Sequence, residues 1–394
     1  MKIYAVICEY NPFHLGHAYQ LSELKRKGAV VCVMSGSFTQ RGDASVLSKY
    51  DRAELAVRSG ADLVLELPFP YSSASAEIFG RAGVHIADAL GCVDSLCFGS
   101  ETGDTESLIA LSDRLCAEDF QNALSQYLLK HKNCSYRTSV GTVYRLCYGE
   151  EFPNSGSNDI LSLSYLSALK ELQSDILPMA LMRKGENYNG GGEGFASATS
   201  IRSHIAEKDW SWIFRNTPEA TAEMLRKAEE NGRLADSQKL FPLFASLVRT
   251  RGVFAFEDIY DISDELASQL CTAGMNAKNA DEFLNLAVSR NDSPSRVRRA
   301  VLSTLMNVKN ADVGEVPYTS VLAANEMGRK ILSAVRKTSS IPIITKPADA
   351  KQHGEPIARA ATLSACADSV WELLCDTPRA GNAMMKEKPR MLFL

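Results

Sequence analysis

The sequence predicts an α/β domain with a doubly wound, mostly parallel sheet, followed by a mainly α-helical domain. Short apolar runs alternate with helical patterns in the first half of the chain, and strand patterns nearly disappear from the second half. The apolar runs are also continuous, which is typical of parallel strands covered on both faces. We expect residues 1–205 to form the α/β domain and residues 206–394 the helical domain.

Each expected strand is a short run rich in Val, Ile, Leu and Cys. The strands are predicted at residues 2–8, 29–34, 61–67, 94–98 and 176–182. Helical patterns separate them, at residues 17–27, 49–59, 74–90 and 105–130. Because ligands of such sheets lie at the carboxyl ends of the strands, we expect the site among the loops that follow them.

The second half of the chain is predicted to be mainly helical. Asn216-Thr217-Pro218-Glu219 is typical of a helix start with proline in the first turn. Helices are expected at residues 219–231, 237–249, 257–273, 280–289, 295–308 and 358–374. Strand character returns only at residues 341–344.

Composition narrows the class of protein. The chain has 394 residues, 45% hydrophobic and 23% charged, as expected for a globular protein of two or three domains. No apolar run reaches the ~18 residues that cross a bilayer, and the N-terminus is typical of a strand, so we expect a cytoplasmic protein without membrane contact. The ten cysteines form no CxxC pair, which favours buried free thiols over zinc or disulfides. With a net charge of −4, a nucleic-acid partner would need a local basic patch.

The segment after the first strand is the strongest candidate for a phosphate site. It opens a helix and has the sequence Glu9-Tyr10-Asn11-Pro12-Phe13-His14-Leu15-Gly16-His17. Gly16 lets a ligand approach the backbone, and a helix N-terminus offers N–H groups and partial positive charge. His14 and His17 project from the same side of the first turn. Together these groups can hold a triphosphate and stabilise charge that develops at its α-phosphorus.

Two histidines three residues apart can also be a surface pair or part of a metal site. Without context such a motif would favour these alternatives by about 3:1. Here the preceding strand, the proline-containing turn and the following helix supply the context. No third ligand lies nearby in the sequence, so no metal site is predicted.

The loop resembles the HIGH motif that nucleotidyltransferases share with class I aminoacyl-tRNA synthetases. A second signature of that superfamily, close to ISSTxIR, is matched by Ala196-Ser197-Ala198-Thr199-Ser200-Ile201-Arg202. Ala196 replaces Ile and Ala198 replaces Ser. The hydroxyls of Thr199 and Ser200 and the guanidinium of Arg202 remain, and they can still reach the β- and γ-phosphates.

Further segments resemble the bacterial tRNA(Met) cytidine acetate ligases, namely residues 9–14, 34–42, 61–68 and 97–101. This resemblance covers most of residues 1–205 and, less sharply, the basic segment near residue 296. It implies a Rossmann-like fold and an enzyme that makes acetyl-adenylate from ATP and acetate. The enzyme would then acetylate N4 of the wobble cytidine in the anticodon of elongator tRNA(Met), giving N4-acetylcytidine. After about residue 310 there is little resemblance.

The resemblance also implies a set of ATP-binding residues. The first group is Ile7, Cys8, Glu9, Tyr10, Asn11, Pro12, Phe13, His14, Leu15, Gly16 and His17. The second group is Gly99, Asn158, Arg183, Thr199, Ser200 and Arg202. His14, His17 and Arg202 are the catalytic candidates, with Mg²⁺ as cofactor. From the residues alone, Gly99 could be a plain strand-end glycine, Ser157 or Asn158 a helix cap, and Arg183 a surface arginine.

The stretch of residues 286–309 is basic, with a single acid, Asp292. Its cations are Arg290, Arg296, Arg298, Arg299 and Lys309. A solvated face is the usual explanation of such a run. In view of the resemblance, we expect Arg296 and Arg299, on one face of the helix, to contact the tRNA backbone. Lys49 and Arg52 at another helix start oppose its dipole, which indicates a phosphate or carboxylate nearby.

Two other functions remain open. A small-molecule adenylyltransferase would need only the α/β domain and would leave the helical domain without a use. A non-catalytic RNA-binding protein could keep the same fold, but the intact set of His14, Gly16, His17, Thr199 and Arg202 argues against it.

Overall fold

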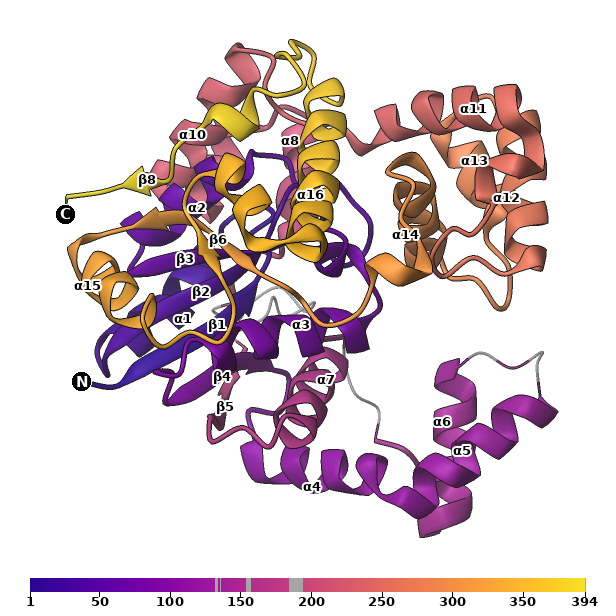
Figure 1. Cartoon of the computed structure of the whole chain (residues 1–394), viewed down its shortest axis with the longest axis horizontal. Helices are drawn as coiled ribbons and strands as arrows, with labels where there is room; N and C mark the ends of the chain where they lie inside the picture. The colour runs from indigo at the N-terminus through magenta and orange to yellow at the C-terminus, as the bar shows by residue number, and fades with distance from the viewer. Residues whose placement is uncertain (132–133, 135, 154–156, 184–193, 394) are drawn as a thin grey trace.

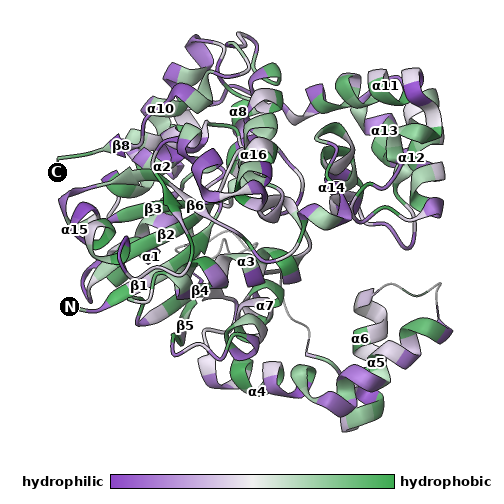
Figure 2. Ribbon diagram, viewed as in Figure 1, coloured by the Kyte–Doolittle hydropathy of each residue, from purple (hydrophilic) through white to green (hydrophobic). Residues whose placement is uncertain are grey.

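The computed structural model describes residues 1–131, 134, 136–153, 157–183 and 194–393. Its centre is one sheet with the strand order β5-β4-β1-β2-β3-β6-β7, and β8 pairs with β6 (Figure 1). The first five strands are all parallel, as predicted. They are β1 (Ile3–Cys8), β2 (Ala29–Ser35), β3 (Leu63–Leu67), β4 (Ser95–Ser100) and β5 (Leu177–Met182). Every residue of β2 and β3 is buried, and the strands form the hydrophobic centre in Figure 2.

Helices cover both faces of this sheet. On one face, α1 (Leu15–Lys25), α2 (Lys49–Arg58) and α16 (Glu355–Leu373) pack with the side chains of Val6 and Cys32 in one core. On the other face, α3 (Ala76–Ala89), α7 (Ser157–Glu171) and α15 (Glu326–Val335) pack with Val31 and Val33. Adjacent residues of β2 therefore point into different cores, which explains why its whole run is apolar.

The predicted helix over residues 105–130 is wrong, because the structure has two helices there. They are α4 (Thr105–Cys116) and α5 (Glu118–Lys130), separated by Ala117 in an extended conformation. The break lets Phe120 and Leu124 pack against Tyr144 of α6 (Tyr136–Tyr148). The hydrophobic contact across α5 and α6 thus outweighs the continuous helical pattern.

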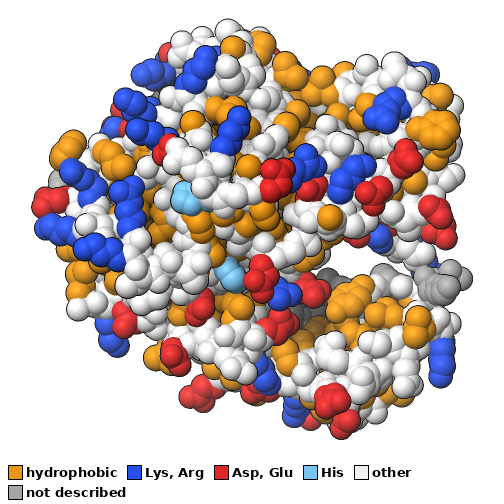
Figure 3. All heavy atoms as spheres, viewed as in Figure 1, with side chains coloured by type: hydrophobic (Ala, Val, Ile, Leu, Met, Phe, Trp, Pro, Cys, Tyr) orange, Lys and Arg blue, Asp and Glu red, His pale blue; other side chains and the backbone are white. Residues whose placement is uncertain are grey.

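A helical body with its own core follows residue 237. It consists of α11 (Leu240–Arg251), α12 (Asp264–Asn276), α13 (Ala280–Ala287) and α14 (Pro294–Leu305), packed around Phe244, Leu270 and Phe283. Helices α8 (Ala198–Ala206), α9 (Trp210–Asn216) and α10 (Glu219–Glu230) lead to it from the sheet. The helix expected from residue 257 begins only at Asp264, where Ser263 caps α12. On the face that Figure 3 shows, the molecule is notched between this body and helices α4–α6.

After the helical body the chain returns to the sheet and adds three strands to it. The predicted division into an α/β domain before residue 205 and a helical domain after it does not include these strands. Strand β6 (Thr319–Ala324) was not predicted, and it pairs with β3 in antiparallel orientation. Strands β7 (Ile343–Ile344) and β8 (Arg390–Met391) pair with β6. The physical reason is that β6 satisfies the backbone groups that β3 would otherwise expose at an edge. The segment from β6 onward is therefore part of the α/β architecture, and the mainly helical part is an insertion between sheet strands.

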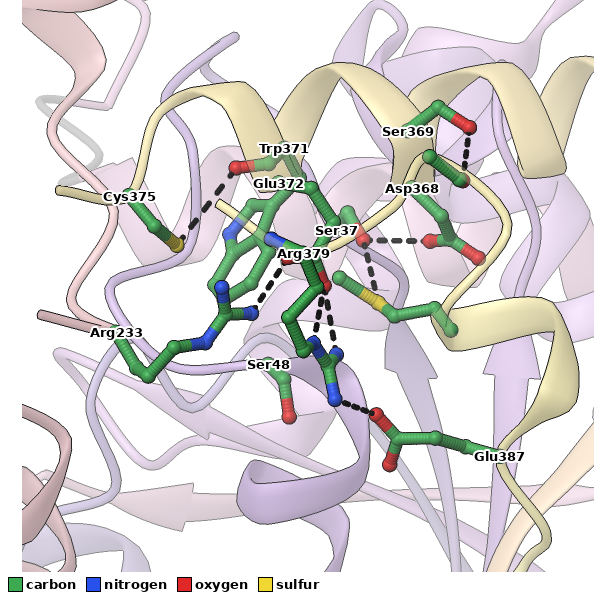
Figure 4. Close-up of polar contacts among 12 residues, drawn as sticks. Ser37, Ser48, Arg233, Asp368, Ser369, Trp371, Glu372, Cys375, Arg379 and Glu387 are labelled. Carbon is green, nitrogen blue, oxygen red and sulfur yellow. Dashed lines mark hydrogen bonds and ion pairs between the residues drawn. The ribbon is translucent and has the colours of Figure 1, made fainter. Parts of the chain in front are cut away.

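Helix α16 fastens this returning segment to the loop after β2 (Figure 4). The Trp371 indole donates to the carbonyl of Ser45 at 2.6 Å, and the Ser37 hydroxyl donates to Asp368 at 2.6 Å. The buried carboxylate of Glu372 accepts from Arg233 and Arg379, at 2.7 and 2.6 Å. Among the described residues, no helix has both the length and the apolar character needed to span a membrane.

Candidate active site

The loop of residues 9–17 runs from the carboxyl end of β1 into α1. Tyr10 is buried with φ of 50°, and the Asn11–Pro12 peptide is cis. The Asn11 amide donates to the carbonyl of Ala44 at 3.3 Å and accepts from the N–H of Val46 at 2.8 Å. The loop is therefore held against the segment that follows β2.

His14 and His17 cap the helix for each other. His14 Nδ1 accepts from the N–H groups of Gly16 and His17, at 3.1 and 3.4 Å, and His17 Nδ1 accepts from the N–H of His14 at 3.3 Å. The two rings stack with centroids 3.5 Å apart. First-turn N–H groups that we expected to be free for a ligand are thus already bonded. In exchange, because both Nδ1 atoms accept, each neutral ring carries its proton on Nε2 and keeps one donor for a ligand.

Both histidines are neutral at pH 7. Burial, together with the positive charge of Arg183, lowers the pKa of His14 to about 4. Burial, His14 and Arg183 hold the pKa of His17 well below its usual value. The pair can therefore donate hydrogen bonds to an oxyanion, while positive charge must come from other residues.

The second motif lies directly against this loop. Ser197 caps α8 by accepting from the N–H of Ser200 at 3.1 Å. Arg202 donates to the carbonyl of Asn11 at 2.7 Å and to the Thr199 hydroxyl at 3.2 Å. Two segments separated by 191 residues therefore meet, as the resemblance implied.

The ends of β4 and β5 lie beside the histidines. A Cβ on Gly99 would lie 3.2 Å from Cγ of Arg183, so the glycine leaves room for the aliphatic part of that side chain. Arg183 is exposed, and its charge reaches both histidine rings. The Asn158 amide donates to Glu101 at 2.7 Å, so this carboxylate holds the amide at the start of α7.

Lys49 and Arg52 build the site's framework. Lys49 lies 2.8 Å from both Glu66 and Asp368. The sequence predicted a phosphate or carboxylate beside this helix start, and the structure shows two protein carboxylates. The fully buried Arg52 donates to the backbone carbonyls of Glu9, Ser35, Gly36 and Leu47. Arg52 joins the loops after β1 and β2, and Lys49 joins β3 to α16, so neither cation is free to bind a ligand.

The two arginines expected to contact tRNA lie on α14 with acidic neighbours. Arg296 lies 3.4 Å from Asp261 and 3.2 Å from Asp292. Arg299 is largely buried, and burial lowers its pKa. The sequence did not indicate a role for Arg298, whose Nε lies 3.4 Å from Asp43 beside the nucleotide loop. The loop after β2 was expected near the site, both because it follows a strand and because residues 34–42 carry the resemblance.

The described part of the chain contains no cluster of three or more His, Cys, Asp or Glu side chains that could hold a metal ion.

A mostly parallel sheet, with this histidine loop at the end of β1 and an arginine motif against it, defines a nucleotidyltransferase of the HIGH class. The family model for HIGH nucleotidyl transferases matches residues 1–386. A tRNA(Met) cytidine acetate ligase from Caldanaerobacter subterraneus subsp. tengcongensis is 34% identical over 365 residues, covering 89% of this chain and 90% of the relative. One from Acetivibrio thermocellus is 32% identical over 379 residues, 91% of each chain. The chain belongs to the family of tRNA(Met) cytidine acetate ligases.

A solved structure shows the same similarity. It is that of Thermotoga maritima TmcAL bound with alpha-thio ATP, with a TM-score of 0.92, 28% identity and coverage of 100% of both chains. The similarity therefore includes the helical body and the returning C-terminal segment as well as the α/β part.

Proposed function

We propose that this protein is a cytoplasmic ATP-dependent ligase that activates acetate as acetyl-adenylate and acetylates N4 of the wobble cytidine of elongator tRNA(Met). The observation that carries the proposal is the contact between Arg202 and the carbonyl of Asn11, beside two neutral histidines. The names of the relatives support the tRNA substrate, and the ATP analogue bound by the Thermotoga maritima protein supports ATP.

In the first step, an acetate oxygen forms a bond to the α-phosphorus of ATP. The bond between that phosphorus and the bridging oxygen breaks, and pyrophosphate leaves with the electron pair. The Nε2–H groups of His14 and His17 donate to the phosphate oxygens as charge develops on them. Arg202 and Arg183 supply the positive charge that the neutral rings lack. Because hydrogen bonds to the loop and to Thr199 hold His14, His17 and Arg202, little reorganisation of these three side chains is needed.

The remaining predicted residues form the walls of the ATP site in this proposal. Backbone groups of the first strand and its loop contact the nucleotide. Gly99 binds it from the neighbouring strand β4, and Asn158 from the start of α7. Thr199 and Ser200 bind phosphate from the start of α8. The full set is Ile7, Cys8, Glu9, Tyr10, Asn11, Pro12, Phe13, His14, Leu15, Gly16, His17, Gly99, Asn158, Arg183, Thr199, Ser200 and Arg202. Mg²⁺ enters with the triphosphate as part of the substrate, since this ion is commonly held through substrate phosphates.

In the second step, the cytidine N4 amine attacks the acetyl carbonyl. The C–N bond forms, the bond to the AMP oxygen breaks, and N4 loses a proton. No covalent enzyme intermediate is required. The nearby thiol of Cys8 is unsuited to that role, because burial raises its pKa well above the usual value and keeps it protonated.

Nucleoside mass spectrometry of bulk tRNA from cells that lack this protein tests the proposal. N4-acetylcytidine should disappear, and it should return with the wild-type gene but not with a His17→Ala copy. Purified protein should restore it on isolated tRNA only when ATP and acetate are both present. Unchanged N4-acetylcytidine in the deletion strain would exclude the function.

A further inference from the structure

The turn of residues 39–43, which follows β2, has no role in the mechanism above. It is closed by hydrogen bonds of 2.9 Å from the N–H of Thr39 to the carbonyl of Asp43 and from the N–H of Gly42 to the carbonyl of Thr39. Phe38 and Ala44 pair as an antiparallel bridge below it. The turn is therefore a defined structure that projects from the carboxyl edge of the sheet.

One side of the turn is attached to the nucleotide loop. The N–H of Gln40 donates to the carboxylate of Glu9 at 2.6 Å, and the Gln40 amide donates to the carbonyl of Ala74 at 3.0 Å. Glu9 itself is partly buried at the start of the histidine loop. The position of residue 41 is consequently fixed relative to His14 and His17.

The other side of the turn is attached to the helical body. Gly42 has φ of +81°, and a Cβ there would lie 2.7 Å from Cβ of Arg298 and 2.8 Å from the backbone N of Arg299. Only glycine permits both this conformation and this close approach of α14. The ion pair between Arg298 and Asp43, at 3.4 Å, lies beside the contact. Helix α14 of the helical body therefore contacts the turn of residues 39–43, which is itself bonded to the nucleotide loop.

Arg41 lies between the two attachments. Its side chain is exposed, and no hydrogen bond or ion pair joins it to any residue that the structure describes. Its charge acts on both Glu9 and Arg202, which places it close to them. Glu9 and Asp43 compensate Arg202. The Arg41 guanidinium is bonded to no carboxylate in the described part of the chain, so it can bind a further anion, and a triphosphate is such an anion.

We propose that Arg41 is a further ATP-binding residue, whose guanidinium contacts the β- or γ-phosphate and then the departing pyrophosphate. Arg298 is a positioning residue that holds the turn through Asp43 and Gly42. This inference rests on the proposed function and adds a contribution of the helical body to the first half-reaction.

Acetate-dependent ATP–pyrophosphate exchange without tRNA tests Arg41. Arg41→Ala should raise KM for ATP about tenfold, which is the loss expected for a charge-assisted hydrogen bond. Arg41→Lys should recover part of the loss, because lysine keeps the charge but not the two-pronged geometry. The matched control is Arg336→Ala, an exposed arginine at the end of α15, which should behave as wild type. Figure 1 shows α15 on the side of the sheet away from helices α11–α14.

Two outcomes would overturn the assignment. Wild-type exchange kinetics in Arg41→Ala would exclude an ATP contact, and a defect confined to KM for tRNA in the complete reaction would assign Arg41 to tRNA phosphates instead. If the wild-type protein itself shows no acetate-dependent exchange, the proposed function fails. Calorimetric titration of wild type and Arg41→Ala with ATP alone still tests the phosphate contact in that case.

The positioning role of Arg298 has a separate readout. Arg298→Ala should raise KM for ATP roughly threefold, and Arg298→Lys should restore it. Added to Arg41→Ala, the Arg298→Ala change should have no further effect, since it acts through Arg41. Fully additive effects in the double variant, or an unchanged KM in Arg298→Ala at an unchanged unfolding temperature, would contradict the role.

Discussion

The loop at the end of β1 and the basic helix α14 both carry residues suited to phosphate, but they hold them differently. In the loop, the Nδ1 atoms of His14 and His17 bond to the loop's own backbone, and both rings are largely buried. On α14, Arg296 and Arg298 are about one-third exposed, and each lies near a carboxylate from a distant segment. The geometry of the histidine loop can be predicted because its interacting residues are contiguous in the sequence. The number of arginines on α14 does not predict which carboxylates the fold places beside them.

The largest effect is expected at the buried charges that support the loop. Lys49→Met removes the cation between Glu66 and Asp368 and leaves two buried carboxylates uncompensated. Burial alone would lower the pKa of Lys49, but the charges of Asp368 and Glu66 outweigh it and raise the pKa well above its usual value. The free energy of unfolding should therefore fall by about 3–5 kcal/mol, measured by urea titration.

The control for this substitution is Lys330→Met, which breaks an exposed pair with Glu326 on α15. The unfolding free energy should then change by about 0.5 kcal/mol or less. An equal fall in the unfolding free energy of the two variants would mean that the buried ion pair contributes no more to stability than the exposed one.

The next largest effect is expected in catalysis. His14→Ala or His17→Ala should lower the rate of acetyl-adenylate formation by about 10²-fold or more, because each removes a fixed donor to the phosphoryl transition state. Each change also removes a cap of α1, so circular dichroism should check that the fold is kept. Turnover close to that of the wild type in either folded variant would exclude the proposed roles.

The pH dependence of the same pair sharpens the comparison. With a pKa of about 4, His14 should be roughly 3% protonated at pH 5.5, against about 90% for a histidine in a model peptide. Since the pKa is lower in the folded state, the contribution of neutral His14 to stability is complete above about pH 6.5 and is lost as the pH falls from 6.5 to about 4. Imidazole NMR resonances of His14 that titrate near pH 6.5 in the free protein would contradict this environment.

The parallel sheet could be predicted because its strands are continuous apolar runs, which few other structures explain. Strand β6 could not, because Thr319–Ala324 has only Val321 and Leu322 as large apolar residues and is defined as a strand by pairing with β3, far away in the sequence. Within the site, the proximity of Arg202 to the histidine loop followed from two motifs. The ion pair of Asp43 with Arg298 could not be predicted, because the two residues are far apart in the sequence and neither belongs to a recognised motif.

The smallest effect is expected on α14. Replacing Arg296 and Arg299 with glutamine should weaken tRNA binding and reduce the salt dependence by about one to two units of log K per log salt. The lower value is favoured, because Arg296 must leave Asp261 and Asp292 before it can bind a phosphate. Acetyl-adenylate formation without tRNA should be unchanged, in contrast to the Arg298 variant. The matched variant is Asp261→Asn, which removes one of the two carboxylates that compete for Arg296 and should tighten tRNA binding. If both changes leave the affinity and the salt slope unaltered, the arginines of this face are only a solvated surface, and the tRNA lies elsewhere on the protein.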